Sequence, residues 1–273
     1  MSQPALYGVV GHPVKHSLSP RIHSFWYDQL ELNARYNALD LVEDQAKQDI
    51  QALCRAGYSG LNITLPHKMA AFEAATELSE AAKKIGAVNT VIANPKTREW
   101  SADNTDWTGF LWSLDRLGKN IPEKAVLIGA GGAARAVAYA LNSRGIQLTI
   151  LNRTVSKAEE LAKELSLNVS RVTSLDDLEN EANHADLVIN TISSGHTGGS
   201  LSLPATRSAL FIDISYGEAA ERTLGPAREN GWATEDGLPM LIGQAADAFK
   251  LWFNLEPDRE AALKAVRNWT GTA

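Results

Sequence analysis

A glycine-rich stretch near the middle of the chain has the spacing of a dinucleotide-binding turn. Gly129, Gly131 and Ala134 follow the apolar segment 124–128 and fall on the pattern G-x-G-x-x-G/A. Gly129 would allow a tight turn. Gly131 would let a pyrophosphate approach the backbone at a helix start, where free N–H groups and the positive end of the helix dipole favour an anion. We therefore expect a strand, a turn and a helix that bind a dinucleotide.

The next apolar segment, 148–151, indicates which dinucleotide would bind. A site for NAD usually ends its second strand in Asp or Glu, which holds the ribose 2′-OH. This segment instead ends in Asn152-Arg153-Thr154, with Lys157 just beyond. A guanidinium attracts a 2′-phosphate and stacks on adenine, whereas a carboxylate would repel the phosphate. The residues predict NADP(H) rather than NAD(H).

Polar side chains recur in the first 106 residues where neither an apolar core nor a plain loop requires them. Asn62 and Thr64 alternate with apolar residues on one expected strand, so both face the same side. Lys68 stands near an expected helix start, where the dipole disfavours a cation. Asn89 falls within another expected strand, and Asp106 opens a helix. Each also has a purely structural explanation: a strand-end hydrogen bond, a solvated lysine or a helix cap.

The loop 11–20 adds two hydroxyl groups to this set. With two prolines and many polar residues it cannot form a regular element. Ser17 lies within the loop. We expect Ser19 to cap the following helix, with Pro20 at the first helical position. Capping alone would explain Ser19 equally well.

A metal centre is not expected. His12, His16, His23 and His67 show no metal-ligand spacing, and Cys54 is the only cysteine. A single cysteine also excludes an internal disulfide.

Composition and length limit the remaining classes of function. The chain has 273 residues, enough for two domains, and a net charge of −6, which argues against nucleic acid as a partner. No apolar run approaches the length of about 20 residues that a membrane span needs. Since no signal-peptide pattern is present, we expect a cytoplasmic protein. A monomer and a homodimer are both compatible with the sequence.

Apolar and amphipathic segments alternate along the chain, which predicts an α/β fold with parallel-type sheets. In the first half we expect strands at 6–10, 36–42, 60–65 and 87–93, with helices between them at 20–30, 45–56 and in the stretch up to residue 85. A second unit begins near residue 105 with a helix at 106–117. Its expected strands are 124–128, 148–151, 187–191, 210–214 and 231–235, with a Ser- and Gly-rich loop at 193–204.

Two helical segments, 240–254 and 258–269, end the chain and are too apolar to stand free. We expect them to pack back on the first domain. That domain would then comprise residues 1–104 and 240–273, and a Rossmann-type doubly wound domain would comprise 105–239.

These residues together form motifs that resemble the shikimate/quinate dehydrogenase family. The resemblance runs from about residue 7 to residue 250. The motifs occur in this order: Gly11-x-Pro-x-x-His-Ser-x-Ser-Pro20, Asn62-x-Thr-x-Pro-x-Lys68, Gly86-Ala-Val-Asn-Thr90, Asn104-Thr-Asp106, Gly129-Ala-Gly-Gly-Ala133, Asn152-Arg-Thr-x-x-Lys157, and Asp236-Gly-Leu238 with Gln244-Ala245.

The resemblance implies a substrate domain, an NADP domain and reversible hydride transfer between NADPH and 3-dehydroshikimate, which gives shikimate. It implies that Lys68 and Asp106 are the catalytic pair. An alkoxide formed by hydride transfer needs a proton, and a lysine beside a carboxylate can either supply it or orient the substrate hydroxyl and stabilise the oxyanion. The substrate-binding residues implied are Ser17 and Ser19 for the carboxylate, Tyr216 near it, and Asn62, Thr64, Asn89, Asp106 and Gln244 for the ring. The cofactor residues implied are Gly129, Ala130, Gly131, Gly132, Ala133, Asn152, Arg153, Thr154, Lys157, Glu80, Ile214 and Gly237.

Three departures from the family pattern bear on the substrate. Trp107 stands where the family usually has Gly, and Pro239 replaces a common Gly. The segment 217–224 after Tyr216 is longer than usual and lacks two prolines, so we expect an atypical loop there. These changes leave open a paralogous dehydrogenase for quinate or an amino-substituted shikimate. A non-catalytic ligand sensor is a further alternative, which the presence of Lys68 and Asp106 disfavours.

Overall fold

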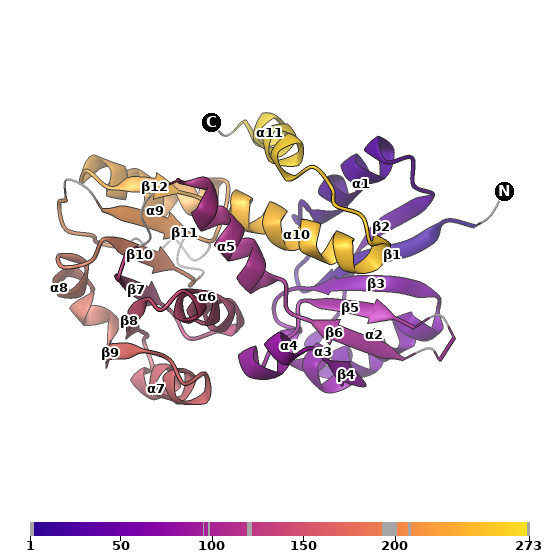
Figure 1. Ribbon diagram of the computed structural model, residues 1–273, viewed down its shortest axis with the longest axis horizontal. Coiled ribbons are helices and arrows are strands. Elements are labelled where there is room, and N and C mark those ends of the chain that lie inside the picture. The colour runs from indigo at the N-terminus through magenta and orange to yellow at the C-terminus, as the bar shows by residue number, and fades with distance from the viewer. Residues whose placement is uncertain are drawn as a thin grey trace. The chain divides into compact units, whose positions relative to one another are not determined.

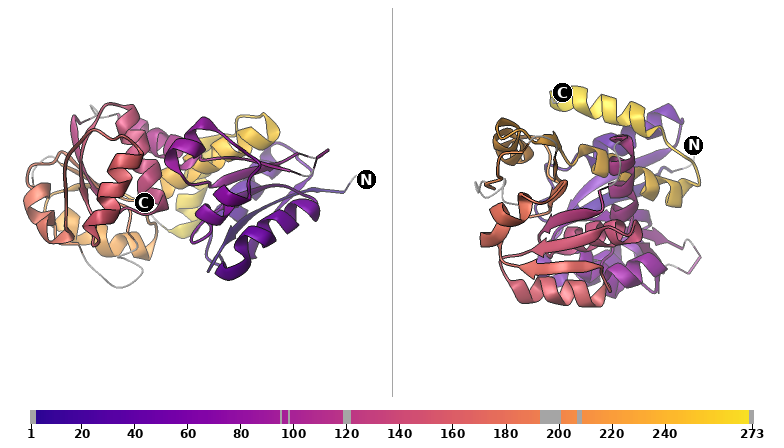
Figure 2. Two further views of the ribbon diagram at one scale, coloured as in Figure 1. Left: turned by 90° about the horizontal axis from the view of Figure 1, so that it is seen from below. Right: turned by 60° about the vertical axis from the view of Figure 1, so that its left-hand side comes forward.

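The computed structural model describes residues 3–94, 96–97, 99–118, 122–192, 201–206 and 209–271. Two compact units divide the chain: unit 1 contains residues 1–109 and 241–267, and unit 2 contains 110–240 and 268–273. Unit 1 is therefore built from two segments that lie far apart in the sequence. Figure 2 shows this as indigo amino-terminal and yellow carboxy-terminal ribbons in the same unit.

Unit 1 is built on a mixed sheet with the strand order β2-β1-β3-β5-β6-β4 (Figure 1). β1 pairs in parallel with β2 and with β3, whereas β5 runs antiparallel to both β3 and β6. The strands are β1 Ala5–Gly11, β2 Ala34–Asp40, β3 Tyr58–Ile63, β4 Glu77–Leu78, β5 Thr90–Ala93 and β6 Trp100–Asp103.

The expectation of a parallel-type sheet holds for β1, β2 and β3 but is wrong for β5, which runs antiparallel to its two neighbours. β5 and β6 are joined by the short connection 94–99, and a connection of that length can only join antiparallel neighbours. β6 itself was not expected. Asn89 lies just before β5 rather than inside a strand.

Helices cover both faces of this sheet because its strands alternate in side-chain direction. On one face, Leu61 and Ile63 of β3 pack with Ile50 of α2 and Ala71 of α3. On the other face, Gly60 of β3 lies against the Trp252 ring of α10, since a Cβ added there would lie 2.3 Å from Nε1. The helices are α1 Ser19–Gln29, α2 Ala46–Arg55, α3 Lys68–Ala74, α4 Glu80–Ile85, α10 Leu238–Phe253 and α11 Arg259–Thr270.

The expected N-cap at Ser19 is wrong. α1 begins at Ser19 itself, and Leu18 is the cap residue, without a side-chain cap hydrogen bond. The Ser17 hydroxyl accepts the backbone N–H of Ser19 at 3.3 Å. The hydroxyl that accepts a backbone N–H at the start of α1 therefore belongs to Ser17.

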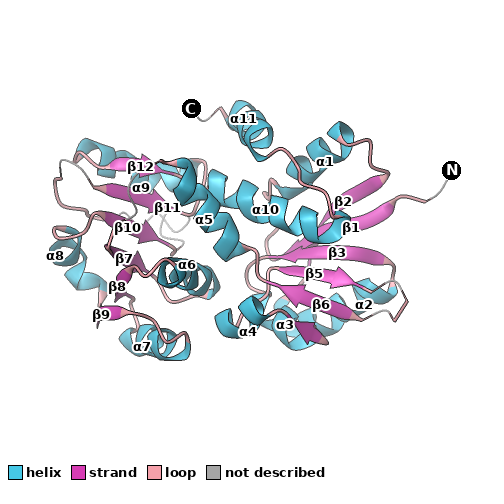
Figure 3. Cartoon of the chain, in the orientation of Figure 1, coloured by secondary structure: helices cyan, strands magenta, loops and turns pink. Residues whose placement is uncertain are grey.

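Unit 2 contains an all-parallel sheet in the order β12-β11-β10-β7-β8-β9 (Figure 3). When the six strands are numbered 1 to 6 along the chain and the sheet is read from β9, the order is 3-2-1-4-5-6, which is the doubly wound order of dinucleotide-binding folds. The strands are β7 Lys124–Ile128, β8 Gln147–Leu151, β9 Val169–Thr173, β10 Leu187–Asn190, β11 Leu210–Asp213 and β12 Ala233–Glu235. The helices are α5 Asp106–Arg116, which begins in unit 1, α6 Gly132–Ser143, α7 Val155–Glu164, α8 Leu178–Ala182 and α9 Glu218–Glu229.

The expected atypical loop at 217–224 is instead the start of α9, which begins at Glu218 with Gly217 as its cap residue. Its Glu, Ala, Arg and Leu residues favour a helix. Most of the loop expected at 193–204 lies outside the described residues, and 201–204 has no regular structure.

Among the described residues, no helix combines the length and the apolar character needed to cross a membrane. The same residues contain no group of three His, Cys, Asp or Glu side chains that could hold a metal ion.

Candidate active site and cofactor site

Two helix starts in unit 1 bring a lysine and an aspartate together. Lys68 is the first residue of α3, and Asp106 is the first residue of α5. The Lys68 ammonium donates a hydrogen bond to Asp106 Oδ2, and the two side chains are only 12% and 9% exposed. The dipole of α5 favours the carboxylate, whereas that of α3 opposes the ammonium. A lysine held in an unfavourable position by one buried carboxylate is a candidate proton donor.

Asn89 lies beside this pair. Its Nδ2 is 2.9 Å from Asp106 Oδ1, 3.0 Å from Thr105 Oγ1 and 3.3 Å from Gln244 Oε1. Its Oδ1 accepts the backbone N–H of Thr105 at 2.6 Å and the Thr90 hydroxyl at 3.1 Å. All five side chains are buried, so the amide orients the carboxylate that binds the lysine.

The segment before α5 fixes the carboxylate from the other side. Asn104 accepts the backbone N–H of Asp106 at 3.1 Å and donates to the carbonyl of Ala87 at 2.9 Å. The Thr105 hydroxyl donates to the backbone carbonyl of Gln244 at 3.0 Å. The Thr105 hydrogen bond joins this segment to α10 within unit 1.

Gln244 approaches the pair because glycines allow two helices to touch. A Cβ added at Gly243 would lie 2.8 Å from the Cα of Gly109. The Gln244 Nε2 donates to the carbonyl of Leu241 at 3.0 Å. The structure therefore brings Lys68, Asp106, Asn89 and Gln244, all predicted site residues, into one cluster.

Asn62 has internal partners on both sides of its amide. It accepts a hydrogen bond from the Tyr36 hydroxyl at 2.7 Å and donates to the carbonyl of Asn89 at 3.3 Å and to Thr90 Oγ1 at 3.2 Å. The side chain is 4% exposed. Tyr36 was not among the residues singled out in the sequence, since tyrosine is common in strands, and Thr90 belonged to a motif but had no assigned role of its own.

The remaining substrate candidates lie at the ends of strands and in the first loop. Thr64 follows β3 directly, is half-buried, and donates its backbone N–H to Val10 at 2.8 Å. Ser17 is half-buried and Ser19 is buried. Tyr216 is half-buried and belongs to unit 2, where it follows β11.

In unit 2, the glycine-rich turn follows β7 as predicted. Gly129 has φ = +117°, and a Cβ there would lie 2.4 Å from Thr191 Oγ1. Gly131 has no atom within 4 Å of an added Cβ, which leaves open space beside it. It is the cap residue of α6, which has no side-chain cap, and Gly132 and Ala133 form its first turn. Backbone N–H groups at an uncapped helix start beside open space fit a pyrophosphate.

The end of β8 lies next to this turn, because Ile128 pairs with Leu151 and the Gly129 N–H donates to the Leu151 carbonyl at 2.8 Å. Asn152 Nδ2 donates to the carbonyl of Thr154 at 2.8 Å. The cationic side chains Arg153 and Lys157 are exposed there. Exposed cations at this edge fit a 2′-phosphate on a bound dinucleotide.

The third part of the expected cofactor site contains Ile214 and Gly237. The buried carboxylate of Asp213 holds the backbone next to Ile214. Asp213 accepts hydrogen bonds from Asn190 Nδ2 at 2.8 Å, from the Thr223 hydroxyl at 2.5 Å and from the Ser215 N–H at 2.8 Å. A Cβ at Gly237 would lie 1.9 Å from the Ile214 carbonyl oxygen. Only glycine permits this approach.

Glu80 differs from the other cofactor candidates. It lies in unit 1, in the first turn of α4, and forms an exposed ion pair with Lys83 at 2.8 Å. The hydrogen bond and charge of Lys83 lower the pKa of the Glu80 carboxyl. In the structure its partner is therefore a neighbouring lysine of its own helix.

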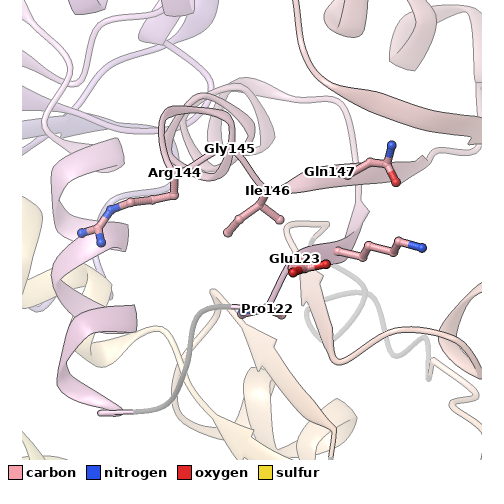
Figure 4. Close-up of a pocket in the computed structure, with 7 residues that line it drawn as sticks. Pro122, Glu123, Arg144, Gly145, Ile146 and Gln147 are labelled. Atoms are coloured by element: carbon pink, nitrogen blue, oxygen red, sulfur yellow. The ribbon is translucent and has the colours of Figure 1, made fainter.

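A cavity of about 440 Å³ lies at the amino ends of β7 and β8 (Figure 4). It is lined by Pro122, Glu123, Lys124, Arg144, Gly145, Ile146 and Gln147. Since dinucleotides bind at the carboxyl ends of parallel strands, this cavity is at the wrong edge of the sheet for the cofactor.

A doubly wound sheet with a glycine-rich turn, together with a lysine–carboxylate pair in a second unit, defines the class of nicotinamide-dinucleotide oxidoreductases. Three family models match the chain: Shikimate dehydrogenase substrate binding domain at residues 9–91, Shikimate / quinate 5-dehydrogenase at 114–220, and Shikimate 5'-dehydrogenase C-terminal domain at 237–267. The chain belongs to the shikimate dehydrogenase family.

Individual relatives support this assignment over nearly the whole chain. A shikimate dehydrogenase (NADP(+)) of Hyphomonas neptunium is 46% identical over 96% of each chain. A crystal structure of shikimate 5-dehydrogenase from Thermus thermophilus with NADP(H) and shikimate is 35% identical, with a TM-score of 0.83, and the match covers 97% of this chain and 99% of that one. The predicted family, fold class and NADP cofactor are confirmed.

The same fold also occurs in a quinate dehydrogenase from Corynebacterium glutamicum, solved in complex with NAD. It is 30% identical, has a TM-score of 0.83, and the match covers 98% of this chain and 100% of that one. The fold alone therefore does not distinguish shikimate from quinate.

Proposed function

We propose that this chain reduces 3-dehydroshikimate to shikimate reversibly, with Lys68 and Asp106 as its catalytic pair. The family reaction is the NADP-dependent interconversion of these two compounds. The observation that carries the assignment of residues is the buried ion pair between Lys68 and Asp106. This ion pair joins the starts of α3 and α5. The motif 62–68 ends at the first of these helix starts, and the motif 104–106 ends at the second.

The residues of unit 1 would manage the proton while the cofactor, when bound, supplies or accepts the hydride. In reduction, the Lys68 ammonium would give a proton to the ketone oxygen, while bound NADPH would supply the hydride to the ketone carbon and be oxidised. Lys68 then recovers a proton from solvent. Asp106 keeps the ammonium oriented and its charge compensated.

The ring hydroxyls would be bound by neutral amides and hydroxyls. We assign Thr64, Asn89 and Gln244 to this role together with Asp106, and Asn62 as the residue that holds Asn89. Ser17 and Ser19 would bind the carboxylate, with Tyr216 near it. Buried polar groups of this kind reject analogues that lack a hydroxyl, because a partner would be left unpaired.

The cofactor would bind along the carboxyl edge of the unit 2 sheet. The proposed positions are Gly129 to Ala133 for the pyrophosphate, Asn152, Arg153, Thr154 and Lys157 for the adenosine 2′-phosphate, and Ile214 and Gly237 at a third point. Glu80 is retained as a contact implied by the family resemblance.

A paralogous dehydrogenase for quinate is the second candidate. It is favoured by the similarity to a quinate dehydrogenase. Trp107, a departure from the family pattern directly after the proposed catalytic carboxylate, leaves this candidate open. Quinate carries an extra hydroxyl on the ring carbon that bears its carboxylate. It would therefore need additional space beside Ser17 and Ser19. A non-catalytic sensor is disfavoured by the enzyme relatives and the intact pair.

Lys68→Ala tests the catalytic assignment. Removing a proton donor lowers turnover by about 10²- to 10⁴-fold, and we expect kcat for shikimate oxidation to fall by that range. The KM for NADP⁺ should stay within about twofold, because no cofactor position is altered. Lys47→Ala, which removes an exposed lysine paired with Glu73, is the matched control. Wild-type kcat in Lys68→Ala would show that the pair is not catalytic.

A further inference from the structure

Tyr36 lies between the two groups of substrate-binding residues assigned above. Its hydroxyl donates to Asn62 Oδ1 at 2.7 Å, and the Ser19 side chain interacts with the same phenol oxygen. Ser19 belongs to the loop proposed for the carboxylate. Asn62 holds Asn89, which is proposed for the ring. One hydroxyl therefore contacts both groups.

The ring of Tyr36 is held rigidly, so its hydroxyl has a defined position. Tyr36 lies on β2, is 7% exposed, and stacks on the imidazole of His23 with 4.2 Å between ring centroids and 5° between planes. On β1, Tyr7 is its strand partner and lies on the same face. A tyrosine has few rotatable bonds, so this packing leaves the hydroxyl little freedom.

From Tyr36 the hydrogen bonds continue to the catalytic carboxylate without leaving the protein interior. Asn62 donates to Asn89 O and to Thr90 Oγ1, and Thr90 in turn donates to Asn89 Oδ1. Asn89 Nδ2 then reaches Asp106 Oδ1 at 2.9 Å. Each member is buried, so a lost bond leaves a polar group unpaired and moves its neighbours.

We propose that Tyr36 is a positioning residue for the substrate: its hydroxyl lies beside Ser19 and holds Asn89 through its hydrogen bond to Asn62, so that the carboxylate and the ring hydroxyls are bound at a set separation. The proposal rests on the function assigned to Ser19 and Asn89. Burial raises the pKa of the Tyr36 hydroxyl well above its usual value, so the group remains protonated and does not take part in proton transfer.

The test compares Tyr36→Phe with Tyr27→Phe. Tyr27 is a matched control because it is 4% exposed, lies 6.2 Å from the same His23 ring, and has a hydroxyl without a hydrogen-bond partner in the described part of the chain. We expect Tyr36→Phe to raise the KM for shikimate about tenfold, the effect of one buried hydrogen bond. The KM for NADP⁺ should change less than about twofold, and Tyr27→Phe should leave both constants within about twofold of wild type.

Asn62→Ala breaks the same hydrogen bond from its other side and provides a second test. If Tyr36 acts largely through Asn62, the double variant should have a KM for shikimate within about twofold of the worse single variant, because effects within one network are not additive. If the increase in the KM for shikimate in the double variant equals the product of the increases in the two single variants, the proposal is contradicted.

Three further outcomes would overturn it. An unchanged KM for shikimate in Tyr36→Phe would show that the hydroxyl does not position the substrate. Loss of NADP⁺ binding in that variant would show a general effect on the fold. A wild-type protein that does not oxidise shikimate would refute the proposed function itself, and it is distinguished from the other two outcomes by the wild-type assay alone.

Discussion

The charge of Lys68 opposes the dipole of the helix it begins, and only Asp106 compensates for it in the cluster described above. The aspartate, in contrast, stands at the favourable end of its own helix. A buried ion pair is weak evidence for stability, because desolvation offsets the attraction between the charges. We therefore attribute this arrangement to proton transfer rather than to stability of the fold.

At the same scale, Arg153→Asp tests the preference for the cofactor. A carboxylate at the end of β8 repels a 2′-phosphate and can instead accept a hydrogen bond from a ribose 2′-OH. We expect the ratio of kcat/KM for NADP⁺ to that for NAD⁺ to fall by about 10²-fold, the effect of losing an attraction and gaining a repulsion. Initial rates with both cofactors at fixed shikimate measure the ratio.

The control for this prediction is Arg171→Asp. Arg171 is an exposed arginine on the neighbouring strand β9, where it pairs with Asp177 at 3.3 Å. That variant should keep the cofactor preference of wild type. If Arg153→Asp also keeps it, the guanidinium is not the group that selects the 2′-phosphate.

Candidate site residues could be proposed from the sequence, but their hydrogen-bond partners could not. Lys68 stood out because a cation is unusual at a helix start, and the structure gives it a buried carboxylate. Tyr36 did not stand out, because its role depends on the distance of its hydroxyl from Asn62, which is 26 residues away in sequence. A contact of that kind is set by strand order and register, and spacing along the chain does not encode it.

At the scale of elements, the turn from β7 to α6 separates glycines needed for the fold from glycines needed for the ligand. Gly131→Ala should leave the melting temperature within about 2 °C of wild type, because the added Cβ meets no atom of the protein. It should raise the KM for NADP⁺ by about tenfold or more, since the methyl group would occupy the space proposed for the pyrophosphate. Thermal unfolding and initial rates on one preparation provide both values.

Gly129→Ala is the matched comparison. It combines φ = +117° with a Cβ 2.4 Å from Thr191 Oγ1, so it should lower the free energy of unfolding by about 1–3 kcal/mol as well as weakening cofactor binding. A Gly131→Ala protein that is as unstable as Gly129→Ala, yet binds NADP⁺ normally, would contradict the assignment of the turn.

Elements with strong periodicity were predicted to within a few residues, whereas those set by pairing partners were not. β7 begins and ends as expected at 124 and 128, whereas β9, an edge strand of the same sheet, was not expected. β6 was missed because its four residues, Trp-Ser-Ala-Asp, show little strand pattern. Only pairing with β5 makes them a strand. The segment 217–224 was expected to be a loop from the family pattern, but the helical propensity of its residues instead favours α9.

At the scale of the whole molecule, the chain leaves unit 1 after residue 109 and returns at 241. This return supplies Gln244 to the lysine–aspartate cluster. It also supplies Trp252, which packs on the face of the sheet that contains Gly60 and whose Nε1 donates to the Val91 carbonyl at 3.1 Å. The stability of unit 1 therefore depends on the last helices of the chain. The expectation that these helices would pack on the first domain depended on their apolar character, which the sequence makes plain.

A histidine in the core of unit 1 leads us to expect that the free energy of unfolding depends on pH. His23 is fully buried among aromatic rings, and burial lowers its pKa from 6.5 to about 3. Below pH 6.5 the unfolded chain therefore binds a proton at His23 that the folded protein does not bind. The free energy of unfolding then decreases as pH falls from about 6.5 towards 3.

Between pH 7 and pH 5 this one histidine should cost about 2 kcal/mol of stability, because the slope approaches about 1.4 kcal/mol per pH unit. Over the same interval, the free energy of unfolding of His23→Phe should fall by about 2 kcal/mol less than that of wild type. Guanidinium unfolding at both pH values measures the difference. Equal losses in wild type and His23→Phe would show that the imidazole does not remain neutral in the core.

The most direct test of the central claim is the initial rate of NADP⁺ reduction at 340 nm with shikimate and with quinate in parallel, repeated with NAD⁺. We expect the highest kcat/KM for shikimate with NADP⁺, and we expect Lys68→Ala to abolish most of that activity. Poor turnover of both acids by a protein that binds NADPH tightly would contradict the claim. That result would mean that Trp107 and the residues around it have adapted the site to another substrate.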